Sequence, residues 1–238
     1  MFNVFITGLN KGCGKTIVTA GLASTMQSLG YSTSIYKPIQ LGATNLGGFK
    51  KSPDVEIIKY FDQNINTKTT YLFTSKNSPF VSCYEDNLKI EMDTIYTDYA
   101  KFSTFYDFNF VEGSNSISTP IITNYTEASL ISKLQIPCIL VVNPKTTNLD
   151  TLILGLEFIA KNNIRLLGII FNAIDDNSEN LEEKYYREII SKFENINILG
   201  SIPYYEDIKY LKPESIISDI LTNFDLEKLF NMKIAKLN

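Results

Sequence analysis

Residues 8–16 read GLNKGCGKT, and they lie between an apolar run, Phe2 to Thr7, and an apolar segment with helical spacing, Thr16 to Leu29. The order of strand, glycine-bearing loop and helix is that of a phosphate-binding P-loop. Glycines allow backbone conformations that turn amide N–H groups inward, and the N-terminus of the following helix adds positive potential for a polyphosphate. The sequence therefore predicts a nucleoside triphosphate site at this loop.

Most of the residues predicted to bind the nucleotide lie within this loop. They are Gly8, Asn10, Lys11, Gly12, Cys13, Gly14, Lys15 and Thr16. Lys15 would reach the β and γ phosphates, and the Thr16 hydroxyl would ligate Mg²⁺. The first glycine is Gly8, one residue upstream of the usual position, which is occupied here by Leu9. The alternative is a chance glycine-rich turn, and the placement of Gly-Lys-Thr at a helix start argues against it.

Short runs rich in β-branched and aromatic residues alternate along the chain with longer segments of helical spacing. The predicted strands are Phe2 to Thr7, Thr33 to Lys37, Asp107 to Val111, Cys138 to Val142, Leu166 to Phe171 and Ile196 to Ile202. The predicted helices are Thr16 to Leu29, Leu149 to Lys161 and Leu181 to Phe193, with short helices after Ile208 and a loop from Leu41 to Pro53. This alternation predicts an α/β fold with a doubly wound, mostly parallel sheet flanked by helices, as one domain over residues 1–238.

The composition limits the classes of function. Of the 238 residues 44% are hydrophobic and 20% charged, and the net charge is -4, so the basic surface that nucleic-acid binding requires is not expected. No apolar stretch approaches the roughly 20 residues that span a bilayer, and no basic leader precedes the first strand, so we expect a cytoplasmic protein without a membrane partner. The absence of histidine excludes Ser-His and Cys-His catalysis.

Two carboxylates are predicted to meet the P-loop. Glu112 follows the strand that ends at Val111, so it would emerge at the carboxyl edge of the sheet, where the P-loop also lies. Asp54 follows Pro53 at a predicted helix start. Because Mg²⁺ prefers carboxylate, hydroxyl and water oxygens, the predicted metal ligands are Thr16, Asp54 and Glu112. The alternatives are that Asp54 only caps its helix and that Glu112 is a solvated strand end.

Lys37 ends the predicted strand that begins at Thr33, and Pro38 after it favours an extended conformation at Lys37. The lysine would then point into the crevice beside Lys15. Two ammonium groups and Mg²⁺ in one pocket suit phosphoryl transfer, because charge on the transferred group and on an anionic acceptor must be neutralised. The predicted catalytic residues are Lys15, Thr16 and Lys37. The alternative is that Lys37 is an exposed lysine at a strand end.

Several short motifs occur in a specific order over most of the chain. They are Gly8 to Thr16, Tyr36-Lys37-Pro38, Asp54, Asn77-Ser78-Pro79, Val111-Glu112-Gly113, Asn172 and Ile202-Pro203. Together these motifs resemble the dethiobiotin synthetase family. The resemblance implies a Mg²⁺- and ATP-dependent cyclo-ligase that forms the ureido ring of dethiobiotin from 7,8-diaminononanoate and CO₂ in biotin biosynthesis.

The resemblance also implies a mechanism and roles for site residues. In the family one substrate amine captures CO₂ as a carbamate, which attacks the γ-phosphate of ATP to give a carbamic-phosphoric anhydride. The second amine then closes the ring, with release of ADP and phosphate. By similarity Lys15 would bridge the carbamate and the γ-phosphate, Lys37 would hold the carbamate, and Thr16, Asp54 and Glu112 would bind Mg²⁺.

The base of the nucleotide has its own expected contacts. By the same resemblance Asn172 would read the adenine edge, because an amide offers both a donor and an acceptor, and Pro203 and Tyr204 would complete the pocket. The alternative is that Asn172 is an ordinary loop-start residue. Family members are homodimers, so the loop from Lys145 to Asp150 is expected to meet the carboxylate of the partner's substrate at a helix N-terminus.

The sequence departs from the family pattern on the acceptor side. Ser114-Asn115-Ser116 replaces a usual Ala-Gly-Gly, Leu41 replaces a hydroxyl residue, Gly12 replaces an acidic or polar residue, and Lys11 replaces a common threonine. A cation at Lys11 would repel a protonated diamine and attract an anionic acceptor. The departures therefore concern the acceptor half of the predicted site.

Two other hypotheses remain open at this stage. One is a P-loop switch ATPase of the partition or metal-insertion type acting on a protein partner. Lys11 favours it in part, because such switches carry an extra P-loop lysine, although theirs lies five residues before the Gly-Lys-Thr lysine and Lys11 lies four before Lys15. The other is an amidoligase-like ATPase or a nucleotide-binding module without turnover.

Overall fold

A seven-stranded sheet forms the centre of the computed structural model, which describes residues 1–175, 178–193, 196–205 and 211–234. Its strands follow the order β11-β10-β9-β1-β6-β2-β5, and every pairing is parallel. They are β1 (Phe2–Gly8), β2 (Thr33–Gln40), β5 (Asn66–Leu72), β6 (Phe108–Glu112), β9 (Cys138–Val142), β10 (Leu166–Ile174) and β11 (Ile198–Pro203). The six predicted strands all belong to this sheet, and the prediction of a doubly wound parallel sheet is confirmed.

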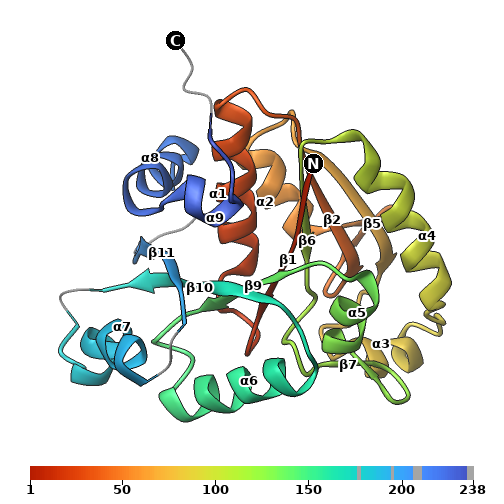
Figure 1. Cartoon of the computed structure of the whole chain (residues 1–238). Coiled ribbons are helices and arrows are strands. Elements are labelled where there is room, and N and C mark those ends of the chain that lie inside the picture. Colours follow the sequence, from red (N-terminus) through yellow and green to blue (C-terminus); the bar gives the residue numbers. More distant parts are fainter. Residues whose placement is uncertain (176–177, 194–195, 206–210, 235–238) are drawn as a thin grey trace.

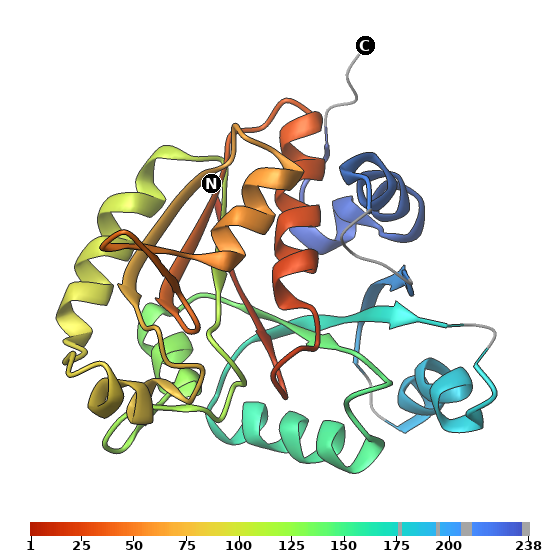
Figure 2. The same ribbon diagram turned by 180° about the vertical axis from the view of Figure 1, so that it is seen from behind.

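Helices cover both faces of the sheet (Figures 1 and 2). One face carries α1 (Lys15–Ser28), α2 (Pro53–Phe61), α8 (Pro213–Asn223) and α9 (Leu226–Phe230). The other carries α4 (Met92–Phe102), which leads into the short 3₁₀ helix η1 (Ser103–Phe105), and α5 (Glu127–Leu134), α6 (Leu149–Lys161) and α7 (Leu181–Phe193). Each face of the sheet packs against its helices as a separate hydrophobic core. Alternate residues of β1 belong to different cores, since Val4 and Ile6 pack on the first face and Phe5 on the second. Burial on both faces explains why the strands read as continuous apolar runs.

Several elements were not predicted from the sequence. The segment from Leu41 to Pro53 is only partly a loop, because it contains the hairpin of β3 (Thr44–Leu46) and β4 (Phe49–Lys51), and Pro53 begins α2. Other unpredicted elements are β5, the short helix α3 (Pro79–Glu85), α4, α5 and the hairpin of β7 (Pro120–Ile122) and β8 (Tyr125–Thr126). The helix start predicted at Asp54 is confirmed as the first turn of α2. The edge strand β5 reads NTKTTYL and is nowhere fully buried, so it lacks the apolar run that identifies central strands.

The predicted C-terminal helices are present as α8 and α9, while Ile208 lies outside the described residues. They contribute to the core as well as cover it, because Ile216 and Ile220 of α8 are fully buried and face Gly21 of α1. Among the described residues, none of the helices combines the length and the apolar character needed to cross a membrane.

Candidate active site

The predicted P-loop joins β1 to α1 as a tight turn of backbone. Gly14 precedes the first residue of α1 with φ of 93°, a left-handed conformation that favours glycine. A side chain at Gly14 would overlap the Asn172 amide. Lys15 is 7% exposed, and its ammonium donates to the Asn115 carbonyl. The loop is therefore packed closely from two sides, by β10 and by the segment that follows β6.

A lysine lies between two carboxylates beside this loop. Lys37 Nζ lies 2.5 Å from Asp54 Oδ2 and 2.7 Å from Glu112 Oε1. The Thr16 hydroxyl also donates to Glu112 Oε1, at 2.7 Å. These side chains share a pocket of about 260 Å³ with Lys11, Gly12, Gly14 and Lys15. The structure therefore brings together all three predicted metal ligands and all three predicted catalytic residues.

The alternatives to these predictions are wrong for Lys37 and Glu112. Glu112 is fully buried rather than solvated, and Lys37 is only 2% exposed. Lys37 does not end its strand, since β2 continues to Gln40. Beyond Tyr36 the pairing of β2 with β6 stops while that with β5 continues, so Pro38 fits there without breaking a two-sided ladder.

Asp54 is positioned by a neighbouring hydrogen-bond chain. The Ser52 hydroxyl accepts from the Val55 amide at 3.1 Å and so caps α2, which means that Asp54 is not the cap. The same hydroxyl donates to the side-chain amide oxygen of Gln40, Oε1, at 2.5 Å. Because Gln40 is the last residue of β2, the start of α2 is tied to the strand that carries Lys37.

The charges in this cluster favour a protonated lysine. Burial alone would lower the pKa of Lys37, but attraction by Glu112 and Asp54 outweighs it and raises the pKa above its usual value. The lysine therefore remains an ammonium at neutral pH.

The donor set suits a hard cation. The predicted metal ligands are two carboxylates and a hydroxyl. Within the described residues no group of three His, Cys, Asp or Glu side chains could hold a metal by itself. Glu112 Oε2 is buried and has no hydrogen-bond partner among the described residues. A buried carboxylate oxygen without a donor is costly, and Mg²⁺ bound there would satisfy it.

Residues predicted to hold the nucleotide base lie on the β10 side of the P-loop, away from the pocket lining. Asn172 is mostly buried and donates from Nδ2 to the Cys13 carbonyl at 3.0 Å. The Tyr204 amide, after Pro203 at the end of β11, donates to the Ile174 carbonyl at 2.7 Å. The first contact places Asn172 against the P-loop, and the second holds the end of β11 beside the end of β10.

The remaining loop residues face inward or toward α6. A side chain at Gly8 would overlap the sulfur of Cys13, which is fully buried, so these two positions offer only backbone to a ligand. Asn10 Nδ2 donates to the Thr146 carbonyl at 2.5 Å. Asn10 thus ties the P-loop to the segment before α6.

Comparison with known protein families identifies the family to which the chain belongs. A family model described as an AAA domain matches residues 3–212, which include the P-loop, Lys37, Asp54 and Glu112. The chain belongs to this AAA domain family. Residues 213–234 with helices α8 and α9 lie beyond the match.

Two curated relatives of this AAA domain chain carry the same name. The ATP-dependent dethiobiotin synthetase BioD of Nitrosopumilus maritimus is 29% identical over 232 residues, which cover 96% of this chain and 99% of the relative. The protein of the same name from Bacillus subtilis strain 168 is 24% identical, with 97% and 98% coverage. The resemblance found in the motifs is therefore confirmed over nearly the full length.

Solved structures of more distant proteins share the fold. Cobyrinic acid a,c-diamide synthase from Mycobacterium smegmatis, solved with ADP and magnesium, aligns with a TM-score of 0.59 at 11% identity and covers 100% of this chain and 99% of its own. The MinC:MinD complex of Aquifex aeolicus gives a TM-score of 0.57 at 15% identity, with 100% and 99% coverage. At these identities the likeness shows the α/β fold alone.

Two residues near the site were missed by the sequence analysis. Gln40 lines the pocket and holds Ser52. Glu127, the first residue of α5, is 1% exposed and binds the segment after Glu112. Neither belongs to a quoted motif. The helix α5 itself was not predicted, so nothing in the sequence indicated that Glu127 turns inward.

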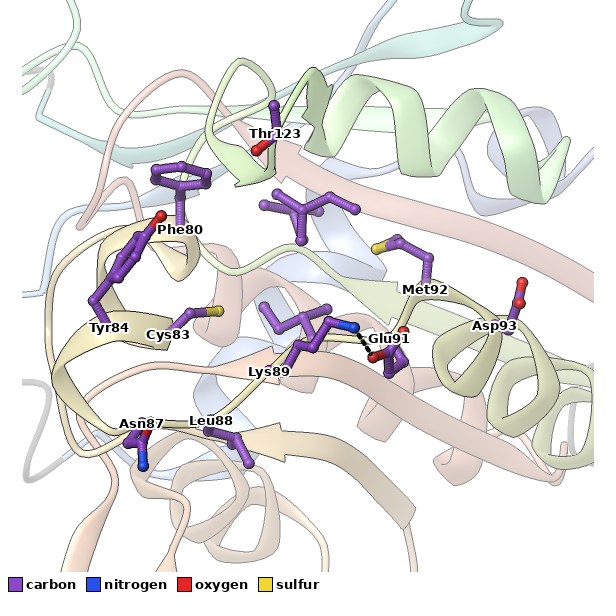
Figure 3. Close-up of a pocket in the computed structure, with 13 residues that line it drawn as sticks. Phe80, Cys83, Tyr84, Asn87, Leu88, Lys89, Glu91, Met92, Asp93 and Thr123 are labelled. Carbon is purple, nitrogen blue, oxygen red and sulfur yellow. Dashed lines mark ion pairs between the residues drawn. The ribbon is translucent and has the colours of Figure 1, made fainter.

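A larger cavity of about 720 Å³ lies apart from these residues, between α3, the segment before α4, and β7. Figure 3 shows Phe80, Cys83 and Met92 around it, with the ion pair of Lys89 and Glu91 beside it. None of the predicted site residues lines this cavity, so volume alone does not identify the candidate site.

Proposed function

We propose that the chain is an ATP-dependent dethiobiotin synthetase that forms the ureido ring of dethiobiotin from 7,8-diaminononanoate and CO₂. The described part of the chain acts as one synthetase domain in this proposal. The observation that carries it is the Lys37 ammonium, held 2.5 Å from Asp54 and 2.7 Å from Glu112 in the pocket that also contains Lys15. The names of the relatives from Nitrosopumilus maritimus and Bacillus subtilis support the same reaction.

Phosphoryl transfer from ATP begins with the residues of the P-loop. The amides of the loop and the start of α1 bind the phosphates, and Lys15 moves from the Asn115 carbonyl to the β and γ phosphates. Thr16, Asp54 and Glu112 would hold Mg²⁺, which supplies positive charge to the phosphate oxygens. The arrangement stabilises the charge that develops on the transferred group.

Lys37 acts on the acceptor side as a fixed cation. One amine of the diamine adds to CO₂ and loses a proton, giving a carbamate whose negative charge the Lys37 ammonium binds. A carbamate oxygen attacks the γ-phosphate, the bond to ADP breaks, and a carbamic-phosphoric anhydride forms. The second amine then attacks the carbamate carbon, closes the ring and expels phosphate, and its extra proton passes to the released phosphate or to water. No step needs a histidine, because the amines are the nucleophiles.

The residues that depart from the family pattern lie near this acceptor. Lys11, Leu41 and Ser114 all line the pocket, and Lys11 Nζ donates to the Lys76 carbonyl of its own chain at 3.1 Å. A cation here favours the anionic carbamate over the protonated diamine. We therefore propose that carbamate formation precedes tight binding of the acceptor.

The proposal extends to the base and to the oligomer. Asn172, Pro203 and Tyr204 would contact adenine, and two chains would form a homodimer with the loop from Lys145 to Asp150 near the partner's substrate. Lys145 Nζ lies 3.0 Å from Asp175 and 3.6 Å from the centre of the Tyr204 ring. These contacts connect the loop from Lys145 to Asp150 with the residues proposed to bind adenine. Light scattering after size-exclusion chromatography tests the dimer.

The reaction is tested by the dependence of ADP release on its substrates. ADP should form only when 7,8-diaminononanoate and bicarbonate are both present with Mg-ATP, and dethiobiotin should appear in equal amount by mass spectrometry. ADP release that needs neither substrate contradicts the proposal.

A switch ATPase acting on a protein partner is the second candidate. A putative plasmid partition protein of Borrelia burgdorferi shares the fold with a TM-score of 0.56 at 17% identity, and Lys11 is an additional P-loop lysine. ATP hydrolysis stimulated by a protein partner and indifferent to the diamine would favour this candidate.

A further inference from the structure

Glu127 is a buried carboxylate outside every motif of the site. It is the first residue of α5, where Thr126 forms the cap, and yet its side chain turns inward and is 1% exposed. Burial of a carboxylate is unfavourable unless hydrogen bonds or charges compensate it. The compensating partners of Glu127 identify what the residue does.

Both oxygens of Glu127 are bound by groups that adjoin the active site. The Thr7 hydroxyl, at the end of β1, donates to Oε1 at 2.6 Å. The Ser114 amide donates to Oε2 at 2.9 Å. The carboxylate also packs against Gly113, where any side chain would overlap it. Glu127 therefore joins the strand before the P-loop to the turn that follows Glu112.

The turn held by Glu127 carries the carbonyl that binds the P-loop lysine. The Lys15 ammonium donates to the Asn115 carbonyl, one residue after the amide that Glu127 accepts from. Further along, the Ile117 amide donates to the Gly8 carbonyl at 2.9 Å. Residues 113–117 thus pack between the P-loop and α5, and Glu127 is the charged side chain that fixes their first half.

We propose that Glu127 is a positioning residue of the active site. Its carboxylate fixes the turn of residues 113–117, and this turn holds the Lys15 ammonium through the Asn115 carbonyl until nucleotide binds. The effect on turnover rests on the proposed function. Ser114-Asn115-Ser116, bulkier than the usual family sequence, gain a defined backbone conformation from this contact.

Three variants separate positioning from simple packing. Glu127→Ala removes the carboxylate, and Glu127→Asp withdraws it by one methylene from both donors. Glu127→Gln keeps an acceptor for the Ser114 amide, and the Thr7 hydroxyl can reverse to accept from the new amide. The matched control is Glu157→Ala, an exposed position on α6.

Two measurements are made on each folded variant. The first is hydrogen exchange of the Ser114 amide by NMR, with the Leu130 amide of α5 as the internal reference. We expect Glu127→Ala and Glu127→Asp to accelerate exchange at Ser114 by about tenfold or more, as loss of a charge-assisted hydrogen bond predicts, without a change at Leu130. Glu127→Gln should restore protection.

The second measurement is steady-state kinetics. Glu127→Ala and Glu127→Asp should raise KM for the diamine and lower kcat by more than they raise the Kd for Mg-ATP, because the P-loop amides still bind the phosphates while the turn beside Lys15 is no longer held. Glu127→Gln should return both constants toward the wild-type values. Glu157→Ala should change nothing.

The outcomes distinguish this inference from the proposed function. Unchanged exchange at Ser114, or unchanged kcat and KM in a folded variant with faster exchange, overturns the role of Glu127. If Glu127→Ala does not fold, Glu127→Asp decides by the same criteria. If the wild-type protein releases no ADP with diamine and bicarbonate, the proposed function fails, while exchange at Ser114 still supports or overturns the positioning of the turn.

Discussion

Replacement of Lys37 by methionine tests the charge balance of the site directly. Methionine keeps most of the length and volume of the side chain and removes the ammonium, so packing changes little. Glu112, whose side chain is 1% exposed, would then lose its cation, and Asp54, whose side chain is 24% exposed, would lose an ion pair. The substitution therefore leaves two neighbouring carboxylates without a counter-charge.

The expected cost follows from the burial of these carboxylates. Removing one partner of a buried ion pair costs roughly 3–5 kcal/mol. The lower end applies here, because Glu112 keeps the hydrogen bond from Thr16 and Asp54 reaches water. For a domain of this size about 3 kcal/mol corresponds to a fall in Tm of roughly 6–12 °C.

The assay is urea unfolding at pH 7 in the presence of EDTA, with Lys101→Met, an exposed lysine on α4, as the control. Added Mg²⁺ should then stabilise Lys37→Met more than the wild type, because the cation binds the freed carboxylates in the folded state only. In the reaction, kcat should fall by about 100-fold or more while the Kd for ATP stays within about threefold. A Lys37→Met protein with an unchanged unfolding midpoint and unchanged kcat refutes this account of Lys37.

Three further outcomes are expected. Thr16→Val should raise the Mg²⁺ concentration needed for half-maximal rate by about tenfold or more, since loss of even an outer-shell partner of a metal costs about that much. An unchanged requirement in a Mg²⁺ titration would remove Thr16 from the metal site. Gly14→Ala should abolish ATP binding in calorimetry and lower the free energy of unfolding by about 1–3 kcal/mol, because the new side chain would overlap Asn172. Gly12 has a similar φ of 81° but open space around it, so Gly12→Ala should lower the free energy of unfolding by only about 1 kcal/mol. Burial raises the pKa of Glu127 above its ordinary 4.5, so the folded chain binds this proton more tightly than the unfolded chain and wild-type stability is lost as pH rises through the raised pKa. The free energy of unfolding of Glu127→Gln relative to wild type should therefore increase with pH above 4.5, and a difference independent of pH would contradict this.

Short sequence patterns predicted the strands at the centre of the sheet but not the strand at its edge. The central strands β1, β6, β9 and β10 are buried on both faces, so each is an apolar run visible in the sequence. The edge strand β5 was not visible, because lysine and threonines alternate along it. The hairpin of β3 and β4 was read as a loop, because Gly47 and Gly48 indicate a turn without indicating the pairing on either side.

Some residues of the candidate site could be predicted from the sequence and others could not, for the same reason. The P-loop lysine and threonine were identifiable because their function requires a fixed local spacing, and Glu112 and Asp54 because the carboxyl ends of parallel strands and the helix starts beside them meet at one edge. Glu127 was not identifiable, because its inward rotation depends on the distance between α5 and the end of β1. That distance belongs to no local pattern.

The amino-acid sequence by itself determined that this is a parallel α/β protein with a P-loop at its first strand, since strand burial and glycine spacing are properties of neighbouring residues. The tertiary structure alone decided that the Lys37 ammonium lies between Asp54 and Glu112, and that Glu127 fixes the turn beside Lys15. These contacts join residues far apart in the chain, and their charges interact strongly only because folding removes the water between them.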